Sequence, residues 1–271
     1  MRTSYGRIHY RHAGAGERTV LLFHINRQSS ALYQELMEAL ASDSRVIAMD
    51  YPSYGLSEHL DRQPAIRDYA RAAAELLDGL GEKRVLPLGE AVGAAVAIDF
   101  ANAFPERCPG VVLLNCPVLP DRAQARAFVQ RVQGDATPGG SELDAEFANP
   151  TAYLAKNASH APLAPTASWL ARVRQARHDC GADCWQAADA LLDFDVLAAL
   201  RELRAPALLL TGEHSPFRAG HDAVIAAASK IEPAVLPDAR FAIGWERAPE
   251  VARRVLAFTR TAAREGVLSA S

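Results

Sequence analysis

Short apolar runs alternate with amphipathic stretches along most of the chain. Apolar runs bounded by turn residues are typical of strands, whereas apolar positions repeated every three or four residues are typical of helices packed on one face. The runs expected to form strands are 5–10, 19–23, 45–49, 84–88, 110–114 and 207–211, and the stretches expected to form helices are 30–41 and 66–80. This alternation predicts an α/β fold, with a mostly parallel sheet covered by helices on both faces.

The alternation stops near residue 117 and resumes near residue 205. The intervening region is rich in Ala, Pro and Arg, and its helical patterns lie at 123–132, 168–177 and 185–200. Because functional sites in such sheets lie at the carboxyl ends of the strands, an insertion here is expected to cover those ends. The sequence therefore predicts a core formed by residues 1–117 and 205–271, with a helical cap formed by residues 118–204.

One segment, residues 84–104, combines a buried strand, a sharp turn and a helix of small residues. Gly89 and Gly93 flank the turn, and Ala91 stands at its tip. This is the skeleton of a nucleophile elbow, G-x-S-x-G, in which a strained strand-to-helix turn exposes the middle side chain above the sheet. The glycines allow the close approach whatever residue stands at the tip, so Ala91 is expected to keep a positive φ. Alanine, however, offers no nucleophile.

Four segments in the same order resemble the α/β-hydrolase family. Residues 18–58 are similar to its second strand and oxyanion loop, residues 88–115 to its elbow, and residues 205–216 and 236–258 to the loops that carry its acid and its histidine. The resemblance covers nearly all of the chain and implies an α/β-hydrolase fold with an inserted helical cap.

The resemblance also implies where a Ser-His-Asp triad should lie. The serine position is Ala91, the acid position is Ser215 and the histidine position is Phe241, and no histidine follows His221. Without a hydroxyl and a base, covalent acyl transfer by a serine is excluded, and the triad is degenerate.

An oxyanion hole can remain when the triad side chains are replaced, because its hydrogen-bond donors are main-chain amides. The resemblance assigns these donors to Asn26 and Val92. Ile25 stands where the family usually has a glycine, so the loop geometry departs from the family pattern.

Three polar side chains near the expected strand ends are candidates for acid or base chemistry. His24 lies in the oxyanion loop, Glu90 directly precedes the elbow tip, and His214 directly precedes the acid position. Each has a structural alternative, because a loop histidine often bonds nearby backbone and a buried carboxyl often packs beside a site.

Three arginines fall on loops at the expected mouth of the site: Arg27, Arg218 and Arg240. A guanidinium group there can bind a carboxylate or a phosphate in two-point fashion. Ordinary solvated arginines are the alternative. If the arginines do line the mouth, they and the apolar residues at the degenerate triad positions predict a small, partly apolar, carboxylate-bearing ligand above Ala91.

Composition and charge limit the classes of molecule that the protein is expected to bind. The 271 residues carry a net charge of −3 at pH 7 and a pI near 6.2, which argues against nucleic acid and anionic membranes. A soluble, cytoplasmic monomer or homodimer that acts on a small molecule without a cofactor is expected, since no long apolar run or leader stands out.

Four cysteines, Cys108, Cys116, Cys180 and Cys184, are too few for a disulfide scaffold and are expected to be free thiols. Two of them, with His178 and Asp179, form an H-D-C-x-x-x-C cluster that has the ligand types for zinc. The spacing is not a standard zinc pattern, so a polar loop with two thiols is favoured and no metal site is expected.

Three classes of function remain. A non-hydrolytic, cofactor-independent enzyme such as a decarboxylase, lyase or cyclase is favoured, because a dry pocket with an oxyanion hole suits loss of CO₂. The first alternative is a non-catalytic small-molecule binding protein. The second is an atypical hydrolase in which Glu90 or His214 activates water directly.

Overall fold

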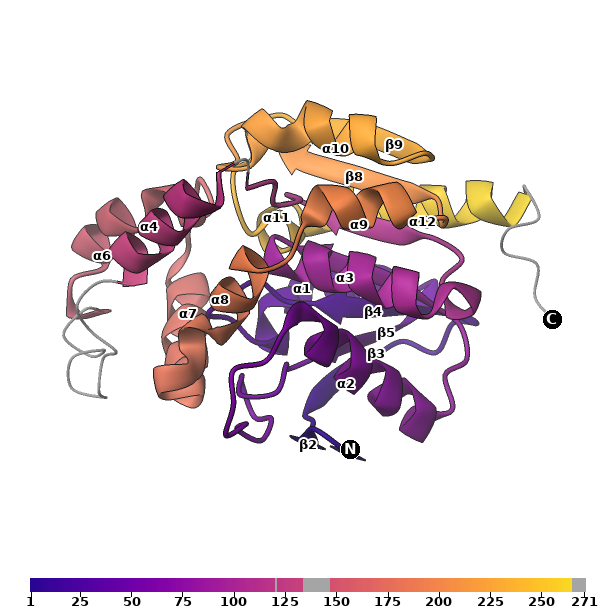
Figure 1. Cartoon of the computed structure of the whole chain (residues 1–271), viewed down its shortest axis with the longest axis horizontal. Helices are drawn as coiled ribbons and strands as arrows, with labels where there is room; N and C mark the ends of the chain where they lie inside the picture. Colours follow the sequence, from indigo (N-terminus) through magenta and orange to yellow (C-terminus); the bar gives the residue numbers. More distant parts are fainter. Residues whose placement is uncertain (120, 134–146, 265–271) are drawn as a thin grey trace.

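A computed structural model describes residues 1–119, 121–133 and 147–264, and a seven-stranded sheet forms its centre (Figure 1). The strand order is β3-β5-β4-β6-β7-β8-β9, and only β3 runs antiparallel within this sheet. The strands are β3 Tyr10–Ala13, β4 Arg18–Phe23, β5 Ser44–Met49, β6 Val85–Glu90, β7 Val111–Leu114, β8 Ala207–Gly212 and β9 Ile231–Leu236. The predicted mostly parallel sheet is confirmed, with the elbow strand β6 at its middle.

Helices cover both faces of the sheet (Figure 1). On one face α2 and α9 pack against α3, and on the other α1 packs against α12. Successive β4 residues alternate between these layers, with Leu21 and Phe23 facing the first and Val20 and Leu22 the second. The core helices are α1 Gln34–Leu40, α2 Ile66–Leu80, α3 Val92–Ala103, α9 Val196–Glu202, α10 His221–Ala227, α11 Ile243–Glu246 and α12 Ala248–Arg264. In the described ranges, none of the helices has the length and apolar character to cross a membrane.

The first predicted strand, 5–10, is wrong. Residues 2–7 instead form a small hairpin from β1 (Arg2–Thr3) and β2 (Gly6–Arg7), in which Thr3 pairs with Gly6. Gly6 has a φ of 84° and Thr3 Oγ1 donates to its carbonyl at 2.9 Å, so the chain reverses where an extended strand was expected.

The segment between β7 and β8 carries helices that lie beyond the carboxyl ends of the strands (Figure 1). They are α4 Arg122–Gln133, α6 Pro150–Lys156, α7 Ala167–Cys180 and α8 Gln186–Leu192. The predicted helix 185–200 is broken, because Asp195 accepts a hydrogen bond from Ala198 N at 2.9 Å and starts α9 anew. Helix α9 packs against α3 and α10, so it lies with the core helices although it falls inside 118–204, the predicted cap.

The elbow has the predicted backbone. Ala91 adopts φ 51° and ψ −118° between the end of β6 and the start of α3, which confirms the expected positive φ. A side chain on Gly93 would place its Cβ 2.1 Å from Phe23 O, and one on Gly89 would place its Cβ 2.0 Å from Gly93 O. The backbones of β4, β6 and α3 therefore approach more closely than any residue but glycine allows.

Gly93→Ala should destabilise the fold by about 3 kcal/mol or more, because the new methyl group meets backbone atoms that cannot move aside. Gly81→Ala is the matched control: Gly81 has a φ of 75°, but an added Cβ would meet nothing within 4 Å, so only backbone strain opposes the substitution. That control should cost about 1 to 2 kcal/mol. Urea unfolding of both variants tests this, and equal losses would contradict the packing argument.

Candidate functional site

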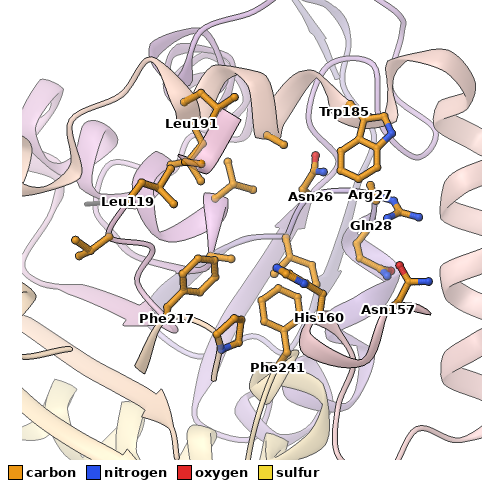
Figure 2. A pocket seen from close by; sticks show the side chains of 18 of the residues that line it. Asn26, Arg27, Gln28, Leu119, Asn157, His160, Trp185, Leu191, Phe217 and Phe241 are labelled. Carbon is orange, nitrogen blue, oxygen red and sulfur yellow. The ribbon is translucent and has the colours of Figure 1, made fainter. Parts of the chain in front are cut away.

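A pocket of about 450 Å³ lies over the elbow tip (Figure 2). Its walls come from the loop after β4 (residues 24–29, the oxyanion loop), the elbow, the helices α4, α6, α7 and α8, and the loop after β9 (residues 237–242, the histidine loop). Ala91 and Val92 line it from below the cap, and Asn26 lines it from the oxyanion loop. A pocket between cap and elbow is thus present where the ligand was expected.

The two expected oxyanion donors both belong to this lining. Val92 is the first residue of α3, so its N–H belongs to the helix terminus that carries partial positive charge. Asn26 Oδ1 accepts a hydrogen bond from the Tyr54 hydroxyl at 2.9 Å, and that hydroxyl in turn accepts one from Ala187 N at 2.9 Å. The oxyanion loop is therefore fixed to the start of α8.

His24 does not line the pocket. Its Nδ1 lies 2.8 Å from Ile25 O and its Nε2 accepts a hydrogen bond from Tyr51 N at 3.2 Å, which assigns the proton to Nδ1. Burial lowers its pKa to about 4. His24 is therefore a neutral side chain whose hydrogen bonds hold the oxyanion loop.

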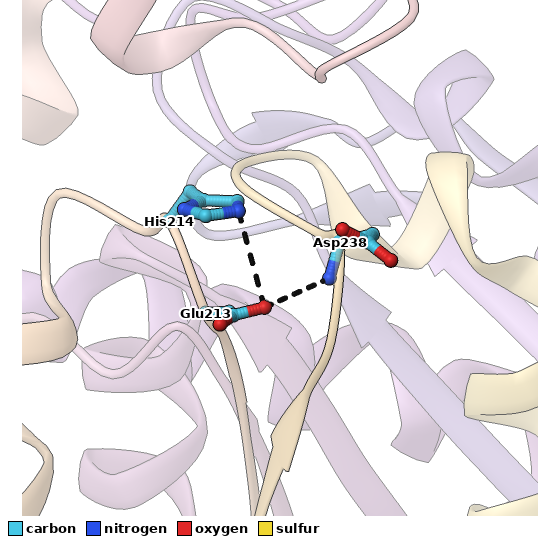
Figure 3. Close-up of side chains that lie close together, drawn as sticks. All are labelled: Glu213, His214 and Asp238. Atoms are coloured by element: carbon cyan, nitrogen blue, oxygen red, sulfur yellow. Dashed lines mark hydrogen bonds and ion pairs between the residues drawn. The ribbon is translucent and has the colours of Figure 1, made fainter.

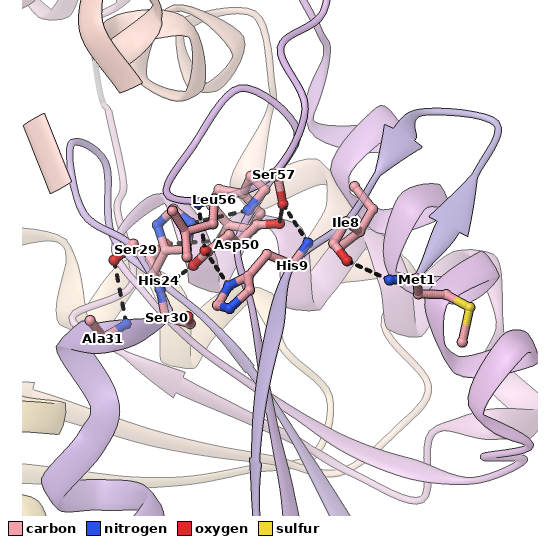
Figure 4. A network of polar contacts seen from close by, with 11 residues as sticks. Met1, Ile8, His9, His24, Ser29, Ser30, Ala31, Asp50, Leu56 and Ser57 are labelled. Carbon is pink, nitrogen blue, oxygen red and sulfur yellow. Dashed lines mark hydrogen bonds and ion pairs between the residues drawn. The ribbon is translucent and has the colours of Figure 1, made fainter. Parts of the chain in front are cut away.

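Asp50 fixes the other side of the same loop (Figure 4). Its carboxylate accepts hydrogen bonds from Ser30 N at 2.6 Å and Leu56 N at 3.0 Å, and it lies 2.7 Å from His9 Nδ1. Burial alone would raise the pKa of Asp50, but these hydrogen bonds and nearby His24 outweigh it and lower the pKa. The carboxylate connects the residue before β3, the start of η1 (Ser30–Tyr33) and the turn after β5.

Glu90 is fully buried and lies outside the pocket lining. Its Oε1 accepts hydrogen bonds from Asn115 Nδ2 at 2.7 Å and Ile243 N at 3.0 Å, and its Oε2 accepts one from Gly244 N at 3.2 Å. Burial raises the pKa of Glu90 to about 7, although these donors favour the carboxylate. Its contacts join the elbow strand to the start of α11, directly after the histidine loop.

The acid and histidine positions expected from the family resemblance differ in their relation to the pocket. Phe241 lines the pocket, and its ring centroid lies 6.3 Å from that of Phe217. Ser215 does not line the pocket; it is buried, and its Oγ accepts a hydrogen bond from Phe217 N at 3.1 Å. Ser215 thus shapes its own turn, whereas Phe241 presents an apolar ring at the floor of the pocket.

His160 lines the pocket and was missed from the sequence (Figure 2). It ends the short helix η3 (Ala158–His160), and its ring packs edge-on against Phe241 with centroids 5.2 Å apart. Burial and the nearby charge of Arg27 lower its pKa to about 4. The structure therefore brings a neutral imidazole from the cap to the ring that occupies the histidine position.

The three candidate arginines lie in different places relative to the pocket. Arg27 lines the pocket, with its guanidinium carbon 4.6 Å from the centroid of the Trp185 ring. Arg240 donates from Nε to Ala161 O at 2.9 Å and from its terminal nitrogen to Pro162 O at 3.0 Å, so it fastens the segment that follows η3. Arg218 starts η5 (Arg218–Gly220) and does not belong to the pocket lining.

The family model of the alpha/beta hydrolase family matches residues 15–260. The chain belongs to this family. Its fold agrees with that of a thermophilic esterase from Thermogutta terrifontis, with a TM-score of 0.77 at 20% identity, over 94% of this chain and 93% of the esterase. The predicted α/β-hydrolase fold is therefore confirmed.

Two relatives by sequence are named as enzymes, one as a dehalogenase and one as a hydrolase. Haloalkane dehalogenase 2 of Mycobacterium tuberculosis is 36% identical over 132 residues, which span 46% of this chain and only 44% of the dehalogenase. The 2-(acetamidomethylene)succinate hydrolase of Mesorhizobium japonicum is 25% identical over 279 residues, 94% of this chain and 92% of that hydrolase. Similarity to the first is thus confined to about half of its length, and similarity to the second extends over nearly all of it.

These relatives overturn the expectation of a decarboxylase, lyase or cyclase, which is wrong for this α/β hydrolase. That expectation rested on the absence of hydroxyl, acid and imidazole from the family positions. Hydrolysis itself needs only water, a base and a polarised substrate, so it does not require the base to stand at the family's histidine position.

His214 is exposed and is not one of the residues that line the pocket. Figure 3 shows it beside Glu213 and Asp238. Its Nε2 is 3.9 Å from Glu213 Oε2, and that oxygen accepts a hydrogen bond from Asp238 N at 3.1 Å. Among the residues with described positions, this exposed trio alone brings three potential metal ligands within 4.8 Å of one another. Cys180 and Cys184 are free and buried, and they do not form such a group with His178 and Asp179.

Glu90→Gln should destabilise the protein by about 2 kcal/mol or more, because an amide NH₂ would face a backbone N–H donor. The loss should depend on pH with a definite sign. The pKa of Glu90 rises from its ordinary 4.5 to about 7 on folding, so its stabilisation is complete below the lower value and is lost as pH rises toward the higher one. The variant lacks this titration.

The stability difference between the two proteins should therefore be larger near pH 5 than near pH 8, by on the order of 3 kcal/mol. Urea unfolding at both pH values measures it. The exposed Glu232 supplies the control Glu232→Gln, which should stay within about 0.5 kcal/mol at each pH. A difference that grows toward alkaline pH would contradict the assignment.

Proposed function

We propose that this α/β hydrolase cleaves a small, partly apolar carbonyl compound with water as its nucleophile and His160 as the base that activates the water. The observation that carries the proposal is the place of His160, an imidazole in the pocket lining against Phe241 at the histidine position. In the proposed mechanism the family's Ser-His-Asp triad is degenerate. Because alanine stands at the elbow tip, no side chain there attacks the substrate.

Glu90 and His214, the two bases that the sequence suggests for this chemistry, do not reach the pocket. The Glu90 oxygens are engaged by Asn115 and by two backbone amides of α11, and the residue lies outside the lining. His214 is exposed and likewise lies outside the lining. A base must reach the proton it removes, directly or through one water, so His160 takes this role.

The reaction follows from the groups at the pocket. His160 is neutral at pH 7, so a ring nitrogen accepts a proton from water while the water oxygen bonds to the substrate carbonyl carbon. The carbonyl oxygen takes the negative charge and is stabilised by the amides of Val92 and Asn26. Collapse of the adduct expels the leaving group, which takes the proton from the imidazolium. Water is consumed and an acid is released.

The shape of the pocket supports a small substrate. About 450 Å³ accommodates a ligand of drug-like size or less, and most of the lining is apolar. Esters, thioesters and lactones of modest size fit these limits. An apolar pocket also excludes competing water, which strengthens each hydrogen bond to the developing charge.

His160→Gln should lower kcat by about 100-fold or more with any ester, thioester or lactone that the protein hydrolyses, because a glutamine cannot accept the proton. Acid release measured at constant pH gives the rate. The control is the exposed His214→Gln, which should keep nearly full activity. Retained activity in His160→Gln, or a loss in His214→Gln, would refute the role.

The pH profile provides a second prediction. The pKa of His160 lies below its ordinary value, at about 4, so the imidazole stays in the base form from neutral pH downward until that value is approached. The kcat/KM of the native protein should therefore be nearly level between about pH 8 and pH 6 and decline only at lower pH. A decline centred near pH 6.5 would show a solvated imidazole instead.

A further inference from the structure

We infer that the end of the pocket formed by Arg27 and Gln28 binds a carboxylate of the substrate, and that the opposite end binds its apolar part. The inference rests on the proposed function, because it assigns the two ends of the same pocket. The substrate class is then a monocarboxylate with an apolar arm and a hydrolysable carbonyl between them, such as a half-ester of a short dicarboxylic acid.

Gln28 carries the inference. Its side chain lines the pocket, only 4% of the residue is exposed, and its amide makes no hydrogen bond to any residue in the described parts of the chain. Among the described residues, the fully buried side-chain atoms that lack a partner do not include this amide, so the amide is open to the pocket and a ligand there can complete its hydrogen bonds. The amide NH₂ offers two donors, which a carboxylate oxygen accepts.

Arg27 gives this end its charge. It holds a φ of 62°, and its guanidinium packs over the Trp185 ring at 4.6 Å. Its charge reaches the pocket, since it contributes to the lowered pKa of His160. It is the one lysine or arginine among the described lining residues. A positive group on an apolar wall favours an anionic ligand over a neutral one.

The remaining polar residues agree with this assignment. Figure 2 shows Arg27, Gln28 and Asn157 on one side of the view. Asn157 Nδ2 donates to Tyr153 O at 2.9 Å, so this amide is held by its own helix. Asp121 is the one acidic residue of the described lining, and its Oδ1 accepts from Ala123 N at 2.8 Å at the start of α4. Asp121 is exposed, and one of its carboxylate oxygens is held at the start of α4.

The other side of Figure 2 is apolar, with Leu119, Leu191 and Phe217. Burying an alkyl or aryl group there is favourable by about 25 cal/mol per Å² of apolar surface removed from water. The two ends thus differ in what they bind, and Ala91 and Val92 line the same pocket. A substrate that fills both ends brings its carbonyl into the cavity that the elbow lines.

The test uses ligands that cannot be hydrolysed, so that binding is measured separately from catalysis. The probes are 4-phenylbutyrate and its neutral counterparts, 4-phenylbutan-1-ol and 4-phenylbutanamide, and calorimetry gives their dissociation constants. The native protein should bind the acid at least about tenfold more tightly than either neutral probe, because a hydrogen bond to a charged group is stronger than one to a neutral group.

Three variants locate the difference. Gln28→Leu should weaken binding of the acid by about tenfold and leave the affinity for the alcohol nearly unchanged. Gln28→Glu should weaken binding of the acid further, because the two negative charges repel each other. Leu191→Ala, at the apolar end, should weaken the binding of all three probes by similar factors. Thermal unfolding of each variant checks that it is folded.

Equal affinity for acid and neutral probes in the native protein, or an unchanged preference in both Gln28 variants, would overturn the inference. His160→Gln should keep the preference for the acid, because it changes the base and not the carboxylate end. Acid preference without turnover would refute the proposed function alone, whereas turnover without acid preference would refute this inference alone.

Discussion

The buried carboxylate of Glu90 is the contact on which the arrangement of the site depends. It accepts hydrogen bonds from Ile243 N, Gly244 N and Asn115 Nδ2, and the Asn115 amide also donates to Arg240 O at 3.2 Å. Arg240 in turn donates to the carbonyls of Ala161 and Pro162. A continuous path of hydrogen bonds therefore joins the elbow strand to the residues directly after His160. Glu90, which the sequence offered as a catalytic candidate, instead holds together the loops around the pocket.

The elbow was predictable because its determinants are local. Gly89 and Gly93 lie within five residues of each other, and the close approach of strand and helix requires them whatever stands at the tip. The same is true of helix 66–80, whose apolar face and terminal glycine can be read in sequence order. The parallel sheet followed from the alternation of such local patterns.

The site was less predictable because its contacts join distant parts of the chain. Arg240 and Ala161 are separated by 79 positions, and no periodicity records that the one donates to the other. The contacts of His160 with Phe241 and of Glu90 with Ile243 are of this kind, so sequence position alone placed the emphasis on His24 and His214. The hairpin at residues 2–7 was missed for a smaller reason, the positive φ of Gly6.

The central claim, that water and not a carboxylate of the protein attacks the substrate, is tested most directly by a single turnover in ¹⁸O-labelled water with the enzyme in excess over an ester substrate. The account predicts that the released acid carries one ¹⁸O atom after the first turnover and that the mass of the protein is unchanged. An unlabelled acid together with ¹⁸O in a carboxyl side chain of the protein would show that a side chain had attacked first, and would contradict the account.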